Sequence, residues 1–155
     1  MEALWRGVVE GSVRPALPAF FPKDAYLQLK AIAGAGSDWT HRLVHDYALD
    51  ISAAHALVTA GASAPSLVGV KVDSRYGHWV EPGVCDNGIG YYEMPGARMV
   101  FRRGSSLHSF GIASMISWRG EWYVVHFGAV LRSAERGVVD EPSRGSGTPT
   151  YSGTC

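Results

Sequence analysis

Asp50 is the residue whose position points most directly to chemistry. It lies in residues 38–59, a segment with helical periodicity, and at about 100° per residue it falls on the apolar stripe between Leu43, Tyr47 and Ala54. A carboxyl group that faces an apolar sheet must be paired or hydrogen-bonded. Where it is not, burial raises the pKa of such a group toward that of a general base. The sequence therefore leaves two interpretations of Asp50 open, an acid–base site and a structural ion pair.

The groups that would complete an acid–base site lie on predicted strands. In that interpretation Asp50 is the base, and the candidate proton donors or orienting groups are Tyr91, Tyr92, His108 and His126. In the structural interpretation Asp50 bonds a tryptophan N–H, a tyrosine hydroxyl or an arginine, with Arg98 as a candidate. The structural interpretation is favoured, because structural networks bury carboxylates as readily as active sites do.

Aromatic residues concentrate on the same predicted strands and favour a binding surface. In the last strand, alternation places Trp122 on one face and Tyr123 and Phe127 on the other, so both faces are apolar. An antiparallel sheet with helices on only one side normally alternates with polar residues. We therefore expect the C-terminal tail, a second subunit or a partner to cover the second face. The predicted ligand-binding residues are Tyr47, Trp118 and Trp122.

No pattern in the chain predicts a metal or cofactor site. His41 and His45 have i, i+4 spacing, with Asp38 one turn earlier. Helical projection places both histidines opposite the apolar stripe, where a third ligand and supporting hydrogen bonds are lacking. The chain also lacks a Gly-x-Ser-x-Gly motif and a glycine-rich phosphate loop. We expect no metal and no cofactor.

The two cysteines, Cys85 and Cys155, predict a disulfide. Cys155 is the last residue and follows a tail rich in glycine, serine, threonine and proline. Such a tail has little reason to be ordered by itself, and a bond to Cys85 would attach it to the body of the protein. Disulfides persist in oxidising compartments. The interpretation is therefore an extracytoplasmic or secreted protein whose signal segment is not part of this chain; the alternative is two free thiols in a cytosolic protein.

Charge and composition exclude two classes of partner. Fourteen basic and fourteen acidic residues cancel in the 155-residue chain. The positive field that supplies most nucleic-acid affinity is missing, so we expect no nucleic-acid partner. No apolar run reaches the length of about 18 residues that a membrane span needs. The 46% apolar content instead indicates a folded domain with a substantial core.

Periodicity predicts helices first and strands second. Helices are expected over 2–11, 23–32 and 38–59, and strands over 67–72, 89–94, 97–102, 107–118 and 121–131. This order favours an α+β fold in which N-terminal helices pack on a curved antiparallel sheet. We expect one domain over residues 1–133 and an irregular C-terminal tail over 134–155.

The segment Ile116-Ser117-Trp118-Arg119-Gly120-Glu121-Trp122-Tyr123-Val124-Val125 resembles the last hairpin of cystatin-like and nuclear-transport-factor-2-like domains. Those domains often end in a hydrophobic-x-Gly-x-Trp pattern, and the order of elements over 1–131 is similar to theirs. The resemblance implies a cone in which the sheet wraps a long helix. The wider stretch 110–139, with the cysteine-ended tail, resembles exported proteins of actinobacteria, which implies a location.

Cone folds host several enzymes and plain binding domains, so the fold alone does not choose between them. The leading hypothesis is an exported binding or accessory domain of the cell envelope that holds a small apolar ligand or a protein partner. The alternative is a small cofactor-free isomerase, dehydratase or hydrolase with an acid–base site in the cone. A homodimer formed through the sheet is a further possibility.

Overall fold

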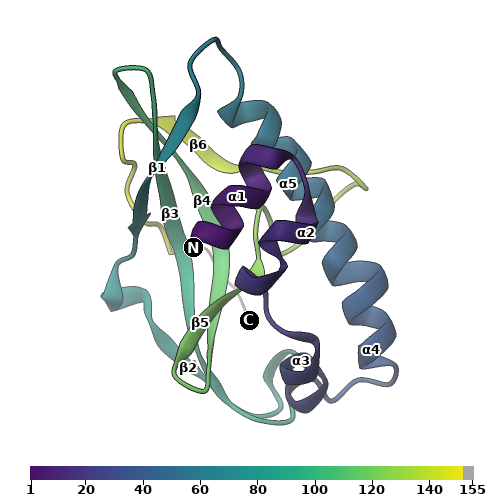
Figure 1. The fold of residues 1–155 in the computed structure, drawn as a ribbon. Helices are drawn as coiled ribbons and strands as arrows, with labels where there is room; N and C mark the ends of the chain where they lie inside the picture. Colours follow the sequence, from purple (N-terminus) through teal and green to yellow (C-terminus); the bar gives the residue numbers. More distant parts are fainter. Residues whose placement is uncertain (152–155) are drawn as a thin grey trace.

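The computed structural model describes residues 1–151 and shows an α+β protein in which helices cover one face of an antiparallel sheet (Figure 1). Residues 152–155 lie outside the described part of the chain. Cys155 is among them, so the Cys85–Cys155 disulfide stays a prediction.

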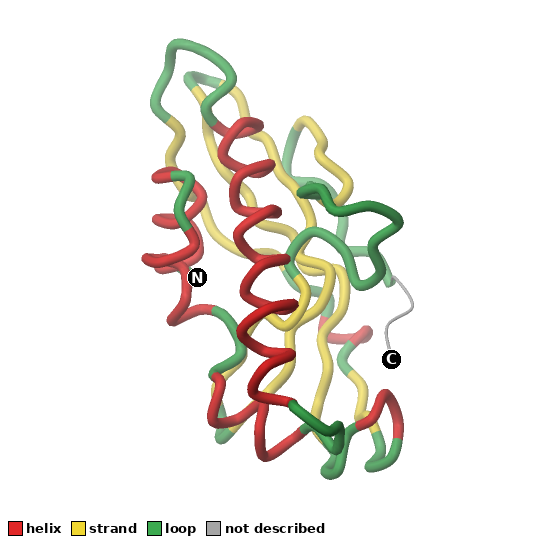
Figure 2. The backbone as a smooth tube through the Cα atoms, turned by 90° about the vertical axis from the view of Figure 1, so that its right-hand side faces the viewer, coloured by secondary structure: helices red, strands yellow, loops and turns green. Residues whose placement is uncertain are grey.

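The helices come first in the chain, as the periodicity predicts. α1 (Glu2–Glu10) ends at Gly11, which takes the left-handed conformation with φ 65°. α2 (Val13–Ala16), the short turn η1 (Leu17–Ala19) and α3 (Lys23–Leu29) follow. α4 (Ala35–Asp38), the π-helical turn η2 (Trp39–Leu43) and α5 (Val44–Val58) then run on without a break. Figure 2 shows this long helix lying along the sheet.

A long central hairpin organises the sheet. It consists of β3 (Tyr91–Arg103) and β4 (Ser106–Trp118). β2 (His78–Val80) pairs with the first part of β3, and β1 (Pro65–Lys71) pairs with its second part. β6 (Asp140–Arg144) pairs with the first part of β4, and β5 (Glu121–His126) pairs with its second part. All pairs are antiparallel and the sheet is not closed. Short helical turns η3 (Ser74–Tyr76) and η4 (Val84–Asp86) connect β1, β2 and β3.

Three features differ from the expected elements. β3 is one strand where two were expected, although it contains Pro95 and Gly96. These residues occupy the interval of β3 that neither β2 nor β1 pairs with, so a missing N–H and a φ of +61° are tolerated there. β5 ends at His126 rather than near residue 131. The segment after residue 133, expected to be irregular, contains β6, which pairs with β4.

The apolar stripe of α5 packs on the sheet as predicted. Tyr47, Ile51, Ala54 and Val58 are all buried. The ring of Tyr47 stacks on Phe20, with 3.6 Å between ring centroids. The side chains that face the helices from the sheet include Met99, Phe101, Phe110 and Ile112, each at most 1% exposed. This layer between helices and sheet is the hydrophobic core.

The C-terminal segment covers part of the opposite, outer face of the sheet. Phe101 contacts Trp5 of α1, so alternation places Arg98 on the outer face. Arg98 is only 2% exposed, because its guanidinium donates to the hydroxyl of Ser143 at 2.9 Å and to the carbonyl of Glu141 at 2.7 Å. Arg98 is therefore a partner of the tail and not of Asp50.

The tail continues across this face beyond β6. Lys71 donates to the carbonyl oxygen of Gly147 at 2.9 Å, and the Thr150 N–H donates to the Gly96 carbonyl at 3.2 Å. A Cβ at Gly96 would lie 1.6 Å from the Thr150 oxygen, so this approach requires glycine. In Figure 1 the yellow segment follows this course past β1. The C-terminal tail, one of the three candidates expected to cover the second face of the sheet, therefore covers part of it. Among residues 1–151, no helix has the length and apolar character to cross a membrane.

Candidate functional site

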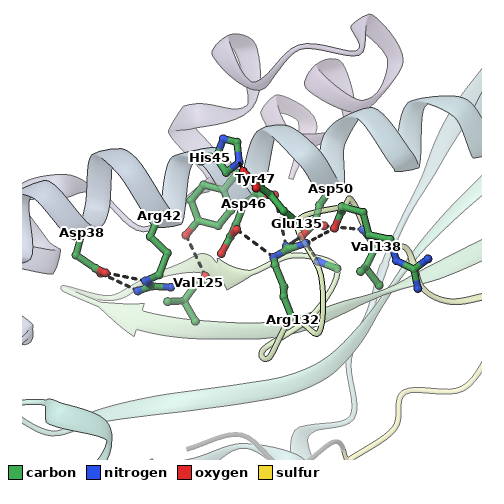
Figure 3. A network of polar contacts seen from close by, with 12 residues as sticks. Asp38, Arg42, His45, Asp46, Tyr47, Asp50, Val125, Arg132, Glu135 and Val138 are labelled. Carbon is green, nitrogen blue, oxygen red and sulfur yellow. Dashed lines mark hydrogen bonds and ion pairs between the residues drawn. The ribbon is translucent and has the colours of Figure 1, made fainter.

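Asp50 is fully buried where the loop between β5 and β6 crosses α5. Its Oδ1 accepts a hydrogen bond from the Val138 N–H at 2.8 Å, and its Oδ2 accepts one from the Gly128 N–H at 2.9 Å. The Arg132 guanidinium donates to Oδ2 at 2.5 Å (Figure 3). Three donors therefore satisfy the carboxylate, and they fasten both ends of the loop to the helix.

Neighbouring contacts extend this arrangement, which we name the loop clamp (Asp46, Asp50, Gly128, Arg132 and Val138). Arg132 Nε lies 3.1 Å from Asp46 Oδ1. A Cβ at Gly128 would lie 1.9 Å from the Val138 carbonyl oxygen, so only glycine permits this close approach. The clamp therefore depends on residues of the loop as well as on the acids of α5.

The prediction that Asp50 is buried is confirmed, and its side-chain partner is an arginine, as the structural interpretation expected, but it is Arg132 and not the candidate Arg98. Arg132 and two backbone N–H groups bind it, and none of the strand residues proposed as partners does so. Asp50 also does not line the cavity described next. The geometry favours the structural interpretation of this residue over the acid–base one.

A small cavity lies between the first turns of the long helix, α3 and the sheet. Its volume is about 40 Å³, room for roughly three water molecules. Apolar side chains such as Phe21, Leu43 and Ile116 form part of the wall. The polar residues that line it are Tyr26, Lys30, Arg42, Asn87, Tyr91, Glu93 and His126. We name this space the polar cavity.

The helical wall of the polar cavity is a closed hydrogen-bond network. Arg42, in the π-helical turn, donates to both carboxylate oxygens of Asp38, each at 2.7 Å (Figure 3). It also donates to the Tyr26 hydroxyl at 3.0 Å, and this hydroxyl donates to Asp38. The bonds from Arg42 lower the pKa of Asp38, and burial together with the bond to Asp38 raises the pKa of Tyr26. This wall holds its charges in fixed positions.

The sheet wall carries a buried acid beside a tyrosine. Glu93 is 2% exposed and accepts a hydrogen bond from the Ser114 hydroxyl. Tyr91 accepts a hydrogen bond from Asn87 Nδ2 at 3.2 Å. Burial and the nearby Glu93 raise the pKa of Tyr91 to about 12. The Tyr91 hydroxyl therefore keeps its proton at neutral pH, and within residues 1–151 that proton has no acceptor.

His126 completes the polar lining from the last residue of β5. It pairs with Ser114 in the sheet register and lines the cavity. Burial, followed by the charges of Arg42, Lys30 and Arg132, lowers the pKa of His126 to about 4. At neutral pH the imidazole is uncharged and offers one N–H donor and one acceptor. In the described chain neither ring nitrogen has a hydrogen-bond partner.

The structure separates the other predicted site residues. His108 lies on β4 beside β6 and not in the polar cavity. Tyr47 is buried, and its hydroxyl donates to the carbonyls of Val124 and Val125 at 3.2 and 3.0 Å. Trp118 is partly buried and contacts Phe21 edge to face. Neither Tyr47 nor Trp118 lines the cavity.

Tyr92 and Trp122 belong to an exposed row on the outer face of the sheet. Register places Trp79 beside Tyr92 on β2 and β3, and Ser117 beside Trp122 on β4 and β5. Trp79, Tyr92 and Trp122 are each at least 41% exposed, and the rings of Trp79 and Tyr92 contact edge to face. We name Trp79, Tyr92 and Trp122 the aromatic row.

Sequence reasoning missed Glu93, Asn87 and Arg42. A signal existed for Glu93, because it stands two residues after Tyr91 and strand alternation puts both on one face. Asn87 reaches the cavity from a loop, and Arg42 from a π-helical turn that shifts the helical projection. No periodic pattern marks either of these two.

No metal site is found among residues 1–151, where no three His, Cys, Asp or Glu side chains gather suitably. His45 instead lies 3.1 Å from Glu135, and both side chains are largely exposed. No protein-family model matches the chain, and comparisons with curated proteins and with solved structures find no match. Its function is therefore argued from geometry.

Proposed function

We propose that the protein is a binding domain that holds a small polar ligand in the polar cavity. The carrying observation is that groups with shifted pKa values gather around this one space. Tyr26, Lys30, Arg42, Tyr91 and His126 all line it. Such clustering in a concave site is a general mark of functional sites.

The lining indicates the chemistry of the ligand. Tyr91 has a free hydroxyl proton, and neutral His126 supplies a donor and an acceptor. Lys30, whose pKa is lowered by burial and by the charge of Arg42, adds a partly buried cation. These groups and the small volume favour a ligand of a few heavy atoms with both donor and acceptor, such as a carboxamide or a short carboxylic acid. They favour it over the apolar ligand expected from the aromatic residues.

A titration with acetamide, urea and acetate tests this function. The readout is the NMR signal of the His126 imidazole in the wild type, in Tyr91→Phe and in the matched control Tyr92→Phe. We expect saturable shifts in the wild type and the control, and affinity at least about threefold weaker in Tyr91→Phe, the loss expected for one neutral hydrogen bond. Equal affinities in the two variants, or no shift with any probe, would contradict the proposal.

Acid–base catalysis is the second candidate, because an uncharged imidazole and a protonated phenol line the same cavity. In this version His126 is the general base and Tyr91 the hydrogen-bond donor, in a small cofactor-free isomerase, dehydratase or hydrolase. This differs from the expectation of Asp50 as base, since Asp50 lies outside the cavity.

Hydrogen–deuterium exchange next to a carbonyl group tests this second candidate. Acetone and acetaldehyde are incubated in D₂O with the wild type, with His126→Gln and with His41→Gln, a control on the exposed helix surface. We expect exchange above background for the wild type and the control only. Exchange by the wild type at only the background rate would contradict the catalytic proposal, and the proposal of ligand binding would still stand.

The aromatic row supports the proposed docking of a protein partner or a second copy on the outer face. Exposed tryptophan and tyrosine side chains are the residue types that dominate interface energetics. Sedimentation velocity over a concentration series, with Trp79→Ser/Trp122→Ser as the comparison, tests the homodimer. A dimer that the double variant abolishes is the expected result, and a strict monomer at every concentration excludes it.

The location at the cell envelope stays part of the proposal and rests on the predicted disulfide and on the resemblance to exported cone-type domains. Intact mass after alkylation without reductant tests it. We expect no alkylation of Cys85 and Cys155 before reduction and two alkylations afterwards. Two alkylations without reductant would remove the argument for export.

A further inference from the structure

A cluster of basic side chains lies beside the last turn of α5, apart from the polar cavity. Register pairs Phe101 of β3 with His108 of β4, and His108 with Arg144 of β6. Arg103 stands two residues beyond Phe101 and therefore on the same face. The three basic residues line a hollow of about 260 Å³, and a neighbouring hollow of about 590 Å³ shares all three. We name Arg103, His108 and Arg144 the basic groove.

The charge of this groove is uncompensated within residues 1–151. Arg103 Nη1 donates to the Leu57 carbonyl at 3.0 Å and has no acidic partner. Arg144 is exposed, and its side chain forms no hydrogen bond or ion pair in the described chain. Partial burial and the charges of Arg103 and Arg144 lower the pKa of His108, and no carboxylate acts against them. Such a local excess of positive charge stands out in a chain whose net charge is zero.

Two arginines in this arrangement fit an anion with several oxygens. A guanidinium presents paired N–H donors that match phosphate and carboxylate geometry. The bond to Leu57 already holds Arg103 in place, so less side-chain freedom is lost when a ligand binds.

We propose that the basic groove binds the phosphoryl group of a phosphate monoester between Arg103 and Arg144. The charge of two guanidinium groups is matched better by a phosphoryl dianion than by the single negative charge of a carboxylate ligand. The hollow is larger than inorganic phosphate requires and leaves room for a remainder of sugar size. This site is independent of the ligand proposed for the polar cavity, since the two share no lining residue.

Calorimetric titration with glucose 6-phosphate, and with glucose as the uncharged comparison, tests the groove. The main variant is Arg144→Gln, because this exposed side chain has no structural partner among residues 1–151. The matched control is Arg102→Gln, which removes the same charge from the adjacent position on the other face of β3. We expect the dissociation constant to rise at least about tenfold in Arg144→Gln and to stay unchanged in Arg102→Gln. Arg144→Lys keeps the charge but lacks the paired N–H donors of a guanidinium. We expect its dissociation constant to lie between those of the other two variants.

Further probes separate the sources of the phosphoryl group. Inorganic phosphate and phosphatidylcholine vesicles with or without phosphatidic acid are tested in parallel. Binding of glucose 6-phosphate without binding to the vesicles supports a soluble ligand, and Arg144-dependent binding to the phosphatidic acid vesicles alone supports a lipid headgroup. Equal losses in Arg144→Gln and Arg102→Gln, or no binding of any phosphate probe to the wild type, would overturn the proposal.

Discussion

The loop clamp and the polar cavity both bury ionisable groups against α5 and its π-helical turn, yet the two regions differ in how their central groups, Asp50 and His126, are hydrogen-bonded. In the clamp, both oxygens of Asp50 accept hydrogen bonds and its charge faces Arg132. In the cavity, His126 has no hydrogen-bond partner within residues 1–151, and the same holds for the buried Oδ1 of Asn87. Asn87 and His126 line the polar cavity, whereas Asp50 does not.

Whether a buried polar group has unused donors or acceptors distinguishes structural from functional groups more reliably than its burial does. A buried charge with a full set of partners destabilises the fold when one partner is removed, and it has no capacity left for a ligand. Polar groups that keep unused donors and acceptors beside a cavity are already partly desolvated, and a ligand can satisfy them. The three predictions that follow test this contrast.

Removal of the Asp50 carboxylate is expected to have the largest effect. Asp50→Ala leaves Arg132 and two backbone N–H groups without their acceptor. We expect the free energy of unfolding to fall by about 3–5 kcal/mol, the range for breaking one side of a buried ion pair. Chemical denaturation at neutral pH measures it.

Two further variants sharpen this result. Asp46→Ala removes the less buried acid that also faces Arg132, and we expect a loss of about 1 kcal/mol or less. The double variant Asp50→Ala/Arg132→Met is expected to lose less than the sum of its single variants, because the two residues are directly coupled. Equal effects of Asp50→Ala and Asp46→Ala would contradict the clamp.

The His126 imidazole is expected to make stability depend on pH. Its folded-state pKa of about 4 lies below the ordinary value of 6.5, so the unfolded chain takes up the proton first as pH falls. The contribution is complete above pH 6.5 and is lost as pH falls through about 4, a total of about 3 kcal/mol. Denaturation of the wild type and of His126→Gln between pH 4 and pH 7 measures the difference.

The control for this pH effect is His41→Gln, at an exposed position of η2. We expect the difference between wild type and His41→Gln to stay flat over the same range. If His126→Gln runs parallel to the wild type instead, then the imidazole is not held uncharged by burial in the cavity.

A pair of tyrosine variants is expected to give the smallest effects and the finest comparison. The Tyr47 hydroxyl donates to the carbonyls of Val124 and Val125, whereas the Tyr91 hydroxyl only accepts from Asn87. We expect Tyr47→Phe to lower the free energy of unfolding by about 1–2 kcal/mol and Tyr91→Phe by less than about 0.5 kcal/mol. Thermal denaturation of both variants provides the measurement. A larger loss of stability in Tyr91→Phe than in Tyr47→Phe would contradict the conclusion that the Tyr91 hydroxyl proton is unused.

Much of the fold was predictable from local patterns. The stripe of Tyr47, Ile51 and Ala54 predicts which face of α5 is buried, because helical spacing decides which side chains share a face. The turn at Gly104 and the flanking apolar runs predict the β3–β4 hairpin. β6 was not predictable, since the segment Asp140-Glu141-Pro142-Ser143-Arg144 is polar throughout and pairs only because β4 offers it a free edge.

The candidate site was predictable only in part. Tyr91 and His126 were identified by residue type, and both line the polar cavity. Asp50 was identified correctly as buried, but its partner Arg132 lies 82 residues away in a loop without periodicity. Contacts of that kind follow from the path of the loop, which no local pattern records.

The sequence by itself determined the class of fold, the burial of Asp50 and the neutral overall charge. These properties follow from spacing and composition, which act over a few residues or over the whole chain. Only the tertiary structure decided that Asp50 meets Arg132, that His126 and Tyr91 share a cavity, and that Arg103 and Arg144 share a groove. Strand register and the path of the loop bring the two members of each pair close together. The free energy that holds them there comes from the packing of the whole domain.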